Sequence, residues 1–160
     1  MKNQMYLMLF FSVLIGSLFH SVEIKAQELG KYIEQYEGRK GARTFRVKLL
    51  RIGEKENEEV LIQISGVDDP ISGKIYKYKK EWQRSEKRFK NYQYVTTQIP
   101  DKERFATLHS NTQYGSQVLK VYLIDNPSEA ISIYPTEYQK NLDPLFMYDQ
   151  YKRQMEEVKK

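Results

Sequence analysis

The sequence predicts a mainly β protein of the α+β class, with a curled or closed antiparallel sheet of about six to seven strands. A short N-terminal helix and a C-terminal helix are expected to flank this sheet. Short runs of alternating apolar and polar residues favour half-buried strands. The connections between these runs are too short for the crossovers that parallel strands need. Helical spacing of apolar residues occurs near the two ends of the chain.

The first helix is predicted at the start of the folded part of the chain. Leu29, Ile33 and Tyr36 recur at helical spacing, and Gly38 offers a stop signal. We therefore expect a helix over roughly residues 28–37, with its apolar stripe packed on the sheet.

Strands follow, beginning with a β-hairpin. Two alternating runs, around Val47 and Ile62, are separated by the charged segment 54–58. Further strands are expected over residues 74–82, 90–97, 103–110, 117–124 and 130–134. The run 117–124 is apolar on both faces, which is typical of a strand covered on both sides. We therefore expect a central strand, with Val121 and Leu123 in the core.

The C-terminal helix has a clear start signal. Asp143 is a suitable N-cap, and Pro144 suits the first helical position. One helical face is predicted to consist of Leu145, Tyr148, Met155 and Val158.

The first 26 residues have the order of a secretory signal peptide. Lys2 precedes an uncharged run over residues 5–19, and the segment then turns polar before Ala26. This run is shorter than the roughly 20 residues that span a bilayer. We expect cleavage after Ala26, which leaves a single globular domain over residues 27–160 with no transmembrane segment. An uncleaved N-terminal anchor is the alternative.

Composition narrows the compartment and the partners. The whole chain carries a net charge of +5, and loss of residues 1–26 leaves +4, an excess too small to demand a nucleic-acid partner. The chain has no cysteine, so an exported domain must rely on its core rather than on disulfides. This combination favours a bacterial protein that is periplasmic or secreted.

A segment rich in basic and aromatic residues, Lys74–Tyr94, is the main candidate for binding. Period two places Tyr76, Tyr78 and Trp82 on one face of a strand and charged residues on the other. One interpretation is structural, with rings in the core and lysines in water. The other is a contact surface for anions and ring-shaped ligands. The ligand-binding residues predicted on this basis are Lys77, Lys79, Trp82, Arg84, Lys87 and Arg88.

Signals for catalysis and for metal binding are weak. His109 is the only histidine after residue 26 and lies beside Ser110, but catalytic pairs are defined by geometry rather than by adjacency. Asp68 and Asp69 are weak candidates for a hard cation, because the sequence lacks the oxygen ligands that calcium needs. No cofactor is expected.

The leading hypothesis is a non-enzymatic exported module that binds an anionic envelope component. Acidic glycan, a lipid headgroup and an acidic protein surface are the candidate partners, and no specific nucleic acid is expected. The first alternative is a small hydrolase that acts on glycan or peptide through carboxylates or His109. The second alternative is a structural partner subunit.

Overall fold

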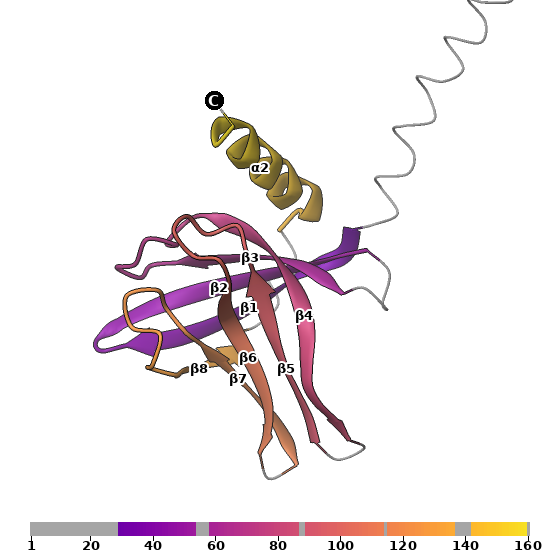
Figure 1. Ribbon diagram of the computed structural model, residues 1–160, viewed down its shortest axis with the longest axis vertical. Coiled ribbons are helices and arrows are strands. Elements are labelled where there is room, and N and C mark those ends of the chain that lie inside the picture. Colours follow the sequence, from indigo (N-terminus) through magenta and orange to yellow (C-terminus); the bar gives the residue numbers. More distant parts are fainter. Residues whose placement is uncertain (1–28, 54–57, 87–88, 114, 137–141, 160) are drawn as a thin grey trace, which may run out of the picture.

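The computed structural model describes residues 29–53, 58–86, 89–113, 115–136 and 142–159, with backbone alone for 84–86, 89 and 113. Eight strands form a closed barrel, and a C-terminal helix packs outside it (Figure 1). The elements are β1 (Leu29–Lys40), β2 (Arg43–Ile52), β3 (Glu59–Ser65), β4 (Ile75–Glu86), β5 (Phe89–Thr96), β6 (Phe105–Gln113), β7 (Ser116–Val121), β8 (Ile131–Pro135) and α2 (Pro144–Glu157).

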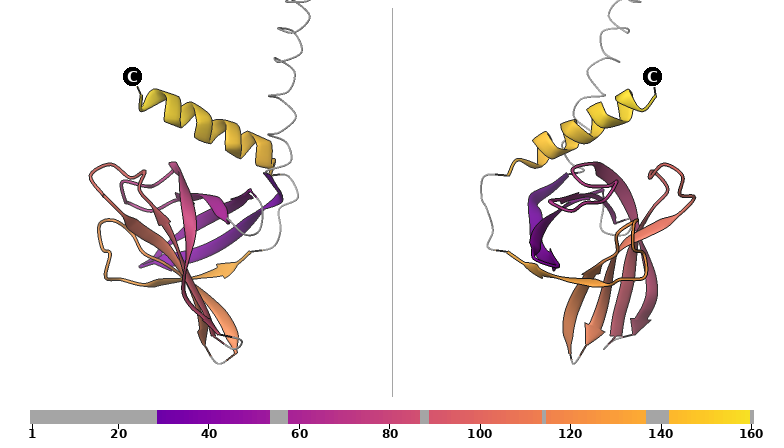
Figure 2. Two further views of the ribbon diagram at one scale, coloured as in Figure 1. Left: turned by 45° about the vertical axis from the view of Figure 1, so that its right-hand side comes forward. Right: turned by 90° about the vertical axis from the view of Figure 1, so that its left-hand side faces the viewer.

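The strands follow one another around the barrel in chain order, and every pairing is antiparallel. β1 and β8 close the ring through three register pairs, Tyr36↔Pro135, Glu37↔Tyr134 and Gly38↔Ile133. Figure 2 shows this ring, with α2 outside it and the β4–β5 and β6–β7 hairpins extending away from the helix. The predicted antiparallel sheet and C-terminal helix are confirmed, but the strand number is eight.

The predicted helix over residues 28–37 is wrong, because β1 occupies this segment. A spacing of four residues, as between Leu29 and Ile33, fits one face of a helix and equally one face of a strand. Both residues lie on the outer face of the barrel under α2, whereas Tyr36 packs against the core inside it. Pairing with both β2 and β8 settles the ambiguity in favour of a strand.

Side chains from all eight strands fill most of the barrel interior. Phe45, Ile62, Tyr78 and Leu108 belong to one cluster of buried residues, which residues of the connecting loops complete at one end. Val121 and Leu123 are buried in this cluster, as predicted. The predicted strand over residues 117–124 is shorter, because β7 ends at Val121 and Leu123 follows it. β7 is also not the centre of an open sheet, because every strand of a closed barrel has two neighbours.

Helix α2 covers the outer face of β1–β4. The Asp143 carboxylate accepts a hydrogen bond from the Leu145 amide, which confirms the predicted N-cap. Met147 is the residue that the helix buries, and Tyr148 packs against the same cluster, as predicted. Leu145 and Val158 are 55% and 70% exposed, so their place on the predicted face is wrong. The run Leu145-Phe146-Met147 is apolar throughout and therefore defines no single face.

Two side-chain amides attach α2 and the loop before β6 to the start of β4. Gln154 accepts from the Ile75 amide at 2.9 Å and donates to the Ile75 carbonyl at 2.7 Å. Gln98 accepts from the Lys77 amide and donates to the Tyr151 hydroxyl. No helix among the described residues is long and apolar enough to cross a membrane.

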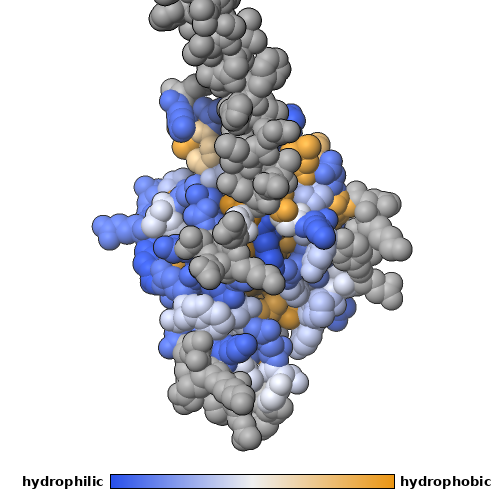
Figure 3. All heavy atoms as spheres, turned by 90° about the vertical axis from the view of Figure 1, so that its right-hand side faces the viewer, coloured by the Kyte–Doolittle hydropathy of each residue, from blue (hydrophilic) through white to orange (hydrophobic). Residues whose placement is uncertain are grey.

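The coloured surface on the side seen in Figure 3 is mainly hydrophilic. On the side seen in Figure 3, hydrophobic side chains gather chiefly toward the end of the molecule that carries α2. Leu145 and Phe146, near the start of α2, are among the exposed large hydrophobic residues.

Gly38, in β1, leaves no room for a larger side chain at the β1–β8 junction. A Cβ atom there would lie 2.5 Å from the Phe45 ring and 2.9 Å from Ile133. We expect Gly38→Ala to lower the free energy of unfolding by about 1–3 kcal/mol through overpacking. Urea denaturation measures this change, and Arg39→Ala, at an exposed neighbouring position, should shift it by less than about 0.5 kcal/mol. Equal effects of the two substitutions would contradict the prediction.

Candidate binding site at one end of the barrel

Three charged residues project into the barrel from β1, β2 and β4. In antiparallel strands, directly opposed residues lie on the same face. Glu34, Arg51 and Lys80 are opposed to the core residues Leu49, Val60 and Tyr94. Glu58, just before β3, joins them through its carboxylate. β1, β2, β4 and the residue before β3 thus place two acids and two bases together.

These four residues form a continuous network of ion pairs. Arg51 Nε lies 2.7 Å from Glu34, and Arg51 Nη1 lies 3.2 Å from Glu58. Lys80 pairs with the other carboxylate oxygen of Glu58. The Tyr36 hydroxyl donates to Glu34 at 2.7 Å. The formal charges cancel, and the side chains of Glu34, Glu58 and Lys80 are largely shielded from water.

Three aromatic rings continue this network along the inner face of β4 and β5. The Lys80 ammonium lies 4.5 Å from the ring centroid of Trp82 and 4.2 Å from that of Tyr92, within the range of cation–π attraction. Trp82 meets Tyr92 edge-on at 5.3 Å, and Tyr92 meets Tyr94 edge-on at 5.5 Å. Exposure falls along this row from 50% at Trp82 to 9% at Tyr92 and 1% at Tyr94.

Tyr94 lies at the buried end of the row. Its hydroxyl has no hydrogen-bond partner in the part of the chain that the structure describes. By contrast, Tyr78 accepts a hydrogen bond from the Thr107 hydroxyl at 2.9 Å, and Tyr92 accepts one from Gln117 at 3.2 Å.

Burial is the largest single influence on the pKa values of Tyr36, Arg51 and Tyr94. It raises the pKa of Tyr94, and burial together with the hydrogen bond to Glu34 raises the pKa of Tyr36. The pKa of Arg51 is also raised, because the interaction with Glu34 outweighs the lowering effect of burial. These shifts keep Tyr36 and Tyr94 neutral and Arg51 charged.

The structure divides the residues that the sequence grouped as a binding surface. Lys77 and Lys79 lie on the outer face of β4, and Trp82 lies on its inner face. The outer lysines border a shallow depression that also contains Glu59, Glu81 and Arg104, so its charges are mixed. Lys77 pairs with Glu59 at 3.3 Å. The backbone of Arg84 belongs to β4, and its side chain, like Lys87 and Arg88, lies outside the described residues.

The weak catalytic candidate does not join a nucleophile–base pair. His109 lies on the outer face of β6, where its ring is 4.4 Å from that of Tyr122. Burial lowers its pKa. Ser110 lies on the inner face and accepts a hydrogen bond from Gln117 at 2.6 Å. The two neighbours in sequence therefore point to opposite sides of the barrel wall.

The two weak candidates for metal binding, Asp68 and Asp69, differ in their exposure to solvent. Asp69 is buried, and its carboxylate accepts hydrogen bonds from the amides of Ile71 and Asp125, which ties two loops together. Asp68 is exposed. Within the described residues, no group of three acidic or histidine side chains gathers to hold a metal ion.

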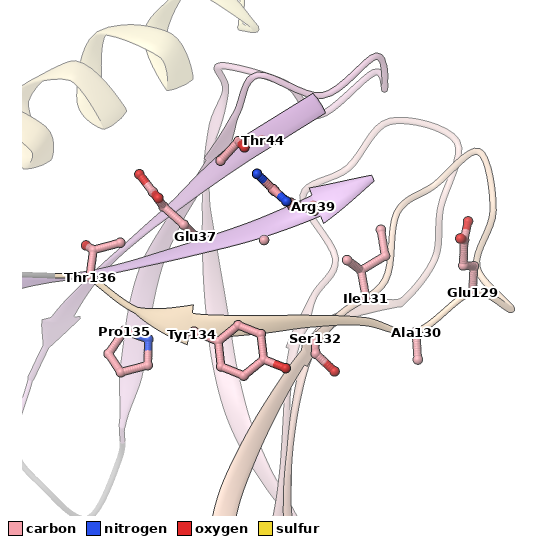
Figure 4. A pocket seen from close by; sticks show the side chains of 11 residues that line it. Glu37, Arg39, Thr44, Glu129, Ala130, Ile131, Ser132, Tyr134, Pro135 and Thr136 are labelled. Atoms are coloured by element: carbon pink, nitrogen blue, oxygen red, sulfur yellow. The ribbon is translucent and has the colours of Figure 1, made fainter. Parts of the chain in front are cut away.

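A second concave feature lies on the barrel wall where β1 and β8 meet (Figure 4). This groove has a volume of about 610 Å³ and includes Glu37, Arg39, Glu129 and Tyr134 in its lining. Glu37 is engaged with Arg46 at 3.0 Å, and Tyr134 is 67% exposed. The groove lacks the buried polar groups that converge at the end of the barrel.

Comparisons with known proteins give no relative: no family model, no curated protein and no solved structure matches this chain. Any functional assignment therefore rests on the geometry of the site itself.

Sequence reasoning missed most of this site. Lys80 had an available signal, because period two places it on the same face as Tyr78 and Trp82. Glu34 was hidden by the mistaken helix, and its partner Arg51 lies 17 residues away in the sequence. Such a contact follows from the pairing of β1 with β2 rather than from a local pattern.

Proposed function

We propose that this chain is an exported, non-enzymatic binding protein that takes a polyhydroxylated ligand, an envelope glycan, at the polar end of its barrel. The observation that carries the proposal is the half-exposed Trp82 beside the charge-balanced network of Glu34, Arg51, Glu58 and Lys80. Eight-stranded barrels are either filled by side chains or hold one small ligand, and the exposed half of Trp82 is the part of this site open to a ligand. Export is part of the proposal and is supported by the signal-like residues 1–26.

The mixture of rings and ion pairs suits a sugar. The apolar C–H face of a pyranose packs on an indole ring, as other flat apolar surfaces do. Carboxylates that already pair with Arg51 or Lys80 still have free lone pairs to accept hydrogen bonds from hydroxyls. Binding sites of this kind combine aromatic walls with a small number of fixed polar groups.

The charge balance favours a neutral ligand over an anionic one. Arg51 already contacts both Glu34 and Glu58, and Lys80 contacts Glu58. An anion entering the site would have to compete with these carboxylates for the same donors, and the displaced carboxylate would remain shielded from water without a partner. The anionic ligand expected from composition is therefore replaced by a neutral glycan in this proposal.

The only tryptophan of the chain, Trp82, is a direct reporter of this site. We expect saturable changes in its fluorescence with neutral oligosaccharides (chitotetraose, cellotetraose and maltotetraose form the panel) and weaker changes with polygalacturonate or phosphatidylglycerol vesicles. In calorimetric titrations, Trp82→Ala should weaken glycan binding about tenfold or more, because central aromatic residues dominate binding.

Tyr134→Ala is the matched control for this experiment, since Tyr134 is an exposed ring on β8, away from the network. It should bind the same oligosaccharides as the unaltered protein does. Absence of binding to every member of the neutral panel would overturn the proposal, and so would equal losses in the two variants. Preferential binding of polygalacturonate or of the vesicles would return the assignment to an anionic partner.

A further inference from the structure

We infer that the hairpin formed by β1 and β2 binds an acidic polysaccharide through the basic side chains at its tip. Residues 37–46 carry four basic residues and one acidic residue, so their net charge of +3 makes up most of the +5 of the whole chain. The tip, where Lys40 pairs with Arg43, lies at the opposite end of these strands from Glu34 and Arg51. This second surface goes beyond the proposed function and does not depend on it.

Three of the four basic side chains of this hairpin have no acidic partner in the part of the chain that the structure describes. Arg46 pairs with Glu37 at 3.0 Å, whereas Arg39, Lys40 and Arg43 form no ion pair there. Arg39 and Arg43 are also exposed. Their charges are therefore available to a partner, and a guanidinium group matches the geometry of a carboxylate.

Lys40 and Arg43 are directly opposed on neighbouring strands, across a two-residue turn. Like charges in this position destabilise an antiparallel pair. Elsewhere on the barrel wall, Glu59 and Lys79 are opposed and carry opposite charges. An anionic group bound between Lys40 and Arg43 would replace the repulsion with two attractions, so this arrangement favours an anionic ligand.

The shape and composition of the tip favour a charged sugar chain over a membrane surface or a nucleic acid. Successive residues of a strand point to opposite faces, so Arg39 and Lys40 lie on different faces of the hairpin, and a flexible chain can contact both. The turn residues Gly41 and Ala42 offer no large apolar side chain of the kind that enters a membrane. Phe45, the aromatic residue of this segment, is buried in the core and cannot stack on a base.

The neighbouring concave features do not extend this surface. Among the described residues that line the groove of Figure 4, two acids, Glu37 and Glu129, outnumber one base, Arg39. The depression beside Lys77 and Lys79 also has mixed charges. The binding surface is therefore the tip of the hairpin itself.

Two matched charge reversals test the inference, with immobilised heparin as the acidic polysaccharide. Arg43→Glu should weaken heparin binding about tenfold or more at low salt, because one attraction becomes a repulsion. Its melting temperature should be unchanged or higher, since opposite charges then face each other on β1 and β2. Lys79→Glu changes the net charge equally, but it should lower the melting temperature by placing like charges opposite each other at Glu59, with heparin affinity unchanged.

Trp82→Ala should bind heparin as the unaltered protein does, and Arg43→Glu should bind neutral oligosaccharides as before, which keeps this test separate from that of the proposed function. Salt at about 1 M should abolish heparin binding, because the screening length falls to about 3 Å. The inference is wrong if the unaltered protein does not bind heparin, if Arg43→Glu and Lys79→Glu lose binding equally, or if Trp82→Ala loses it. Tighter binding to phosphatidylglycerol vesicles than to heparin would overturn it in favour of a membrane surface.

Discussion

Replacement of Leu123 by alanine is expected to lower the free energy of unfolding by about 2–5 kcal/mol. Leu123 is 1% exposed and belongs to the cluster that fills the barrel, beside the fully buried Val121. Removal of its isobutyl group forfeits the transfer free energy of the buried atoms and leaves a cavity. Leu123 follows the last residue of β7 and packs among core side chains from several strands, and because such interiors are closely packed we expect little relaxation.

Leu145→Ala provides a control with the same chemistry. Leu145 is 55% exposed on α2, and alanine is at least as good a helix former. Its substitution should change the free energy of unfolding by less than about 0.5 kcal/mol. Guanidinium denaturation of the two variants gives the comparison, and similar midpoints for both would show that Leu123 is not a core residue.

Alkaline pH is expected to destabilise the protein steeply. Burial raises the pKa of Tyr78 and Tyr94, and burial with the Glu34 hydrogen bond raises that of Tyr36. The unfolded chain releases these protons near pH 10, whereas the folded protein retains them. Above pH 10 the unfolded state therefore binds fewer protons, and stability falls as pH rises. Each group lowers the free energy of unfolding by about 1.4 kcal/mol per pH unit, and the three together lower it by about 4 kcal/mol per pH unit.

Melting temperatures measured between pH 8 and pH 12 should be level at first and then fall sharply above about pH 10. The part of the tyrosinate absorbance that comes from these three of the chain's 13 tyrosines should rise together with the loss of β-sheet circular dichroism, because their hydroxyls ionise only on unfolding. The Tyr94→Phe variant should show a slope reduced by about one third, since one of three groups is removed. Stability that stays constant to pH 12 would contradict the assignment of these hydroxyls to a buried, neutral state.

The sequence specified the strands better than it specified their closure. Alternation around Val47 and Ile62 correctly predicted strands. A strand that buries one face repeats apolar residues at every second position, which is the pattern found there. At Leu29 and Ile33 the reading of apolar spacing failed, since an interval of four residues fits both the helical period of 3.6 and the strand period of two. Closure of the barrel depends on the partner of β1, and β8 lies at the far end of the sheet-forming sequence.

The candidate site was predictable only in part. Alternation correctly buried Tyr76 and Tyr78 and put Trp82 on the same side. The ion pairs of Arg51 with Glu34 and Glu58 required knowledge of strand register, because each joins residues of different strands or loops. Charge alone also misled, since the predicted surface included Lys77 and Lys79, which face outward, and omitted Lys80, which faces inward.

The three register pairs between β1 and β8 have a consequence for folding kinetics. They join positions roughly a hundred residues apart, so the loop-closure entropy is large and the step is intrinsically slow. A molecule whose other strands have paired before this closure has two unpaired edges, each able to pair with another chain. Closure removes both edges at once, and its rate rather than the final stability sets the time during which newly made molecules can aggregate.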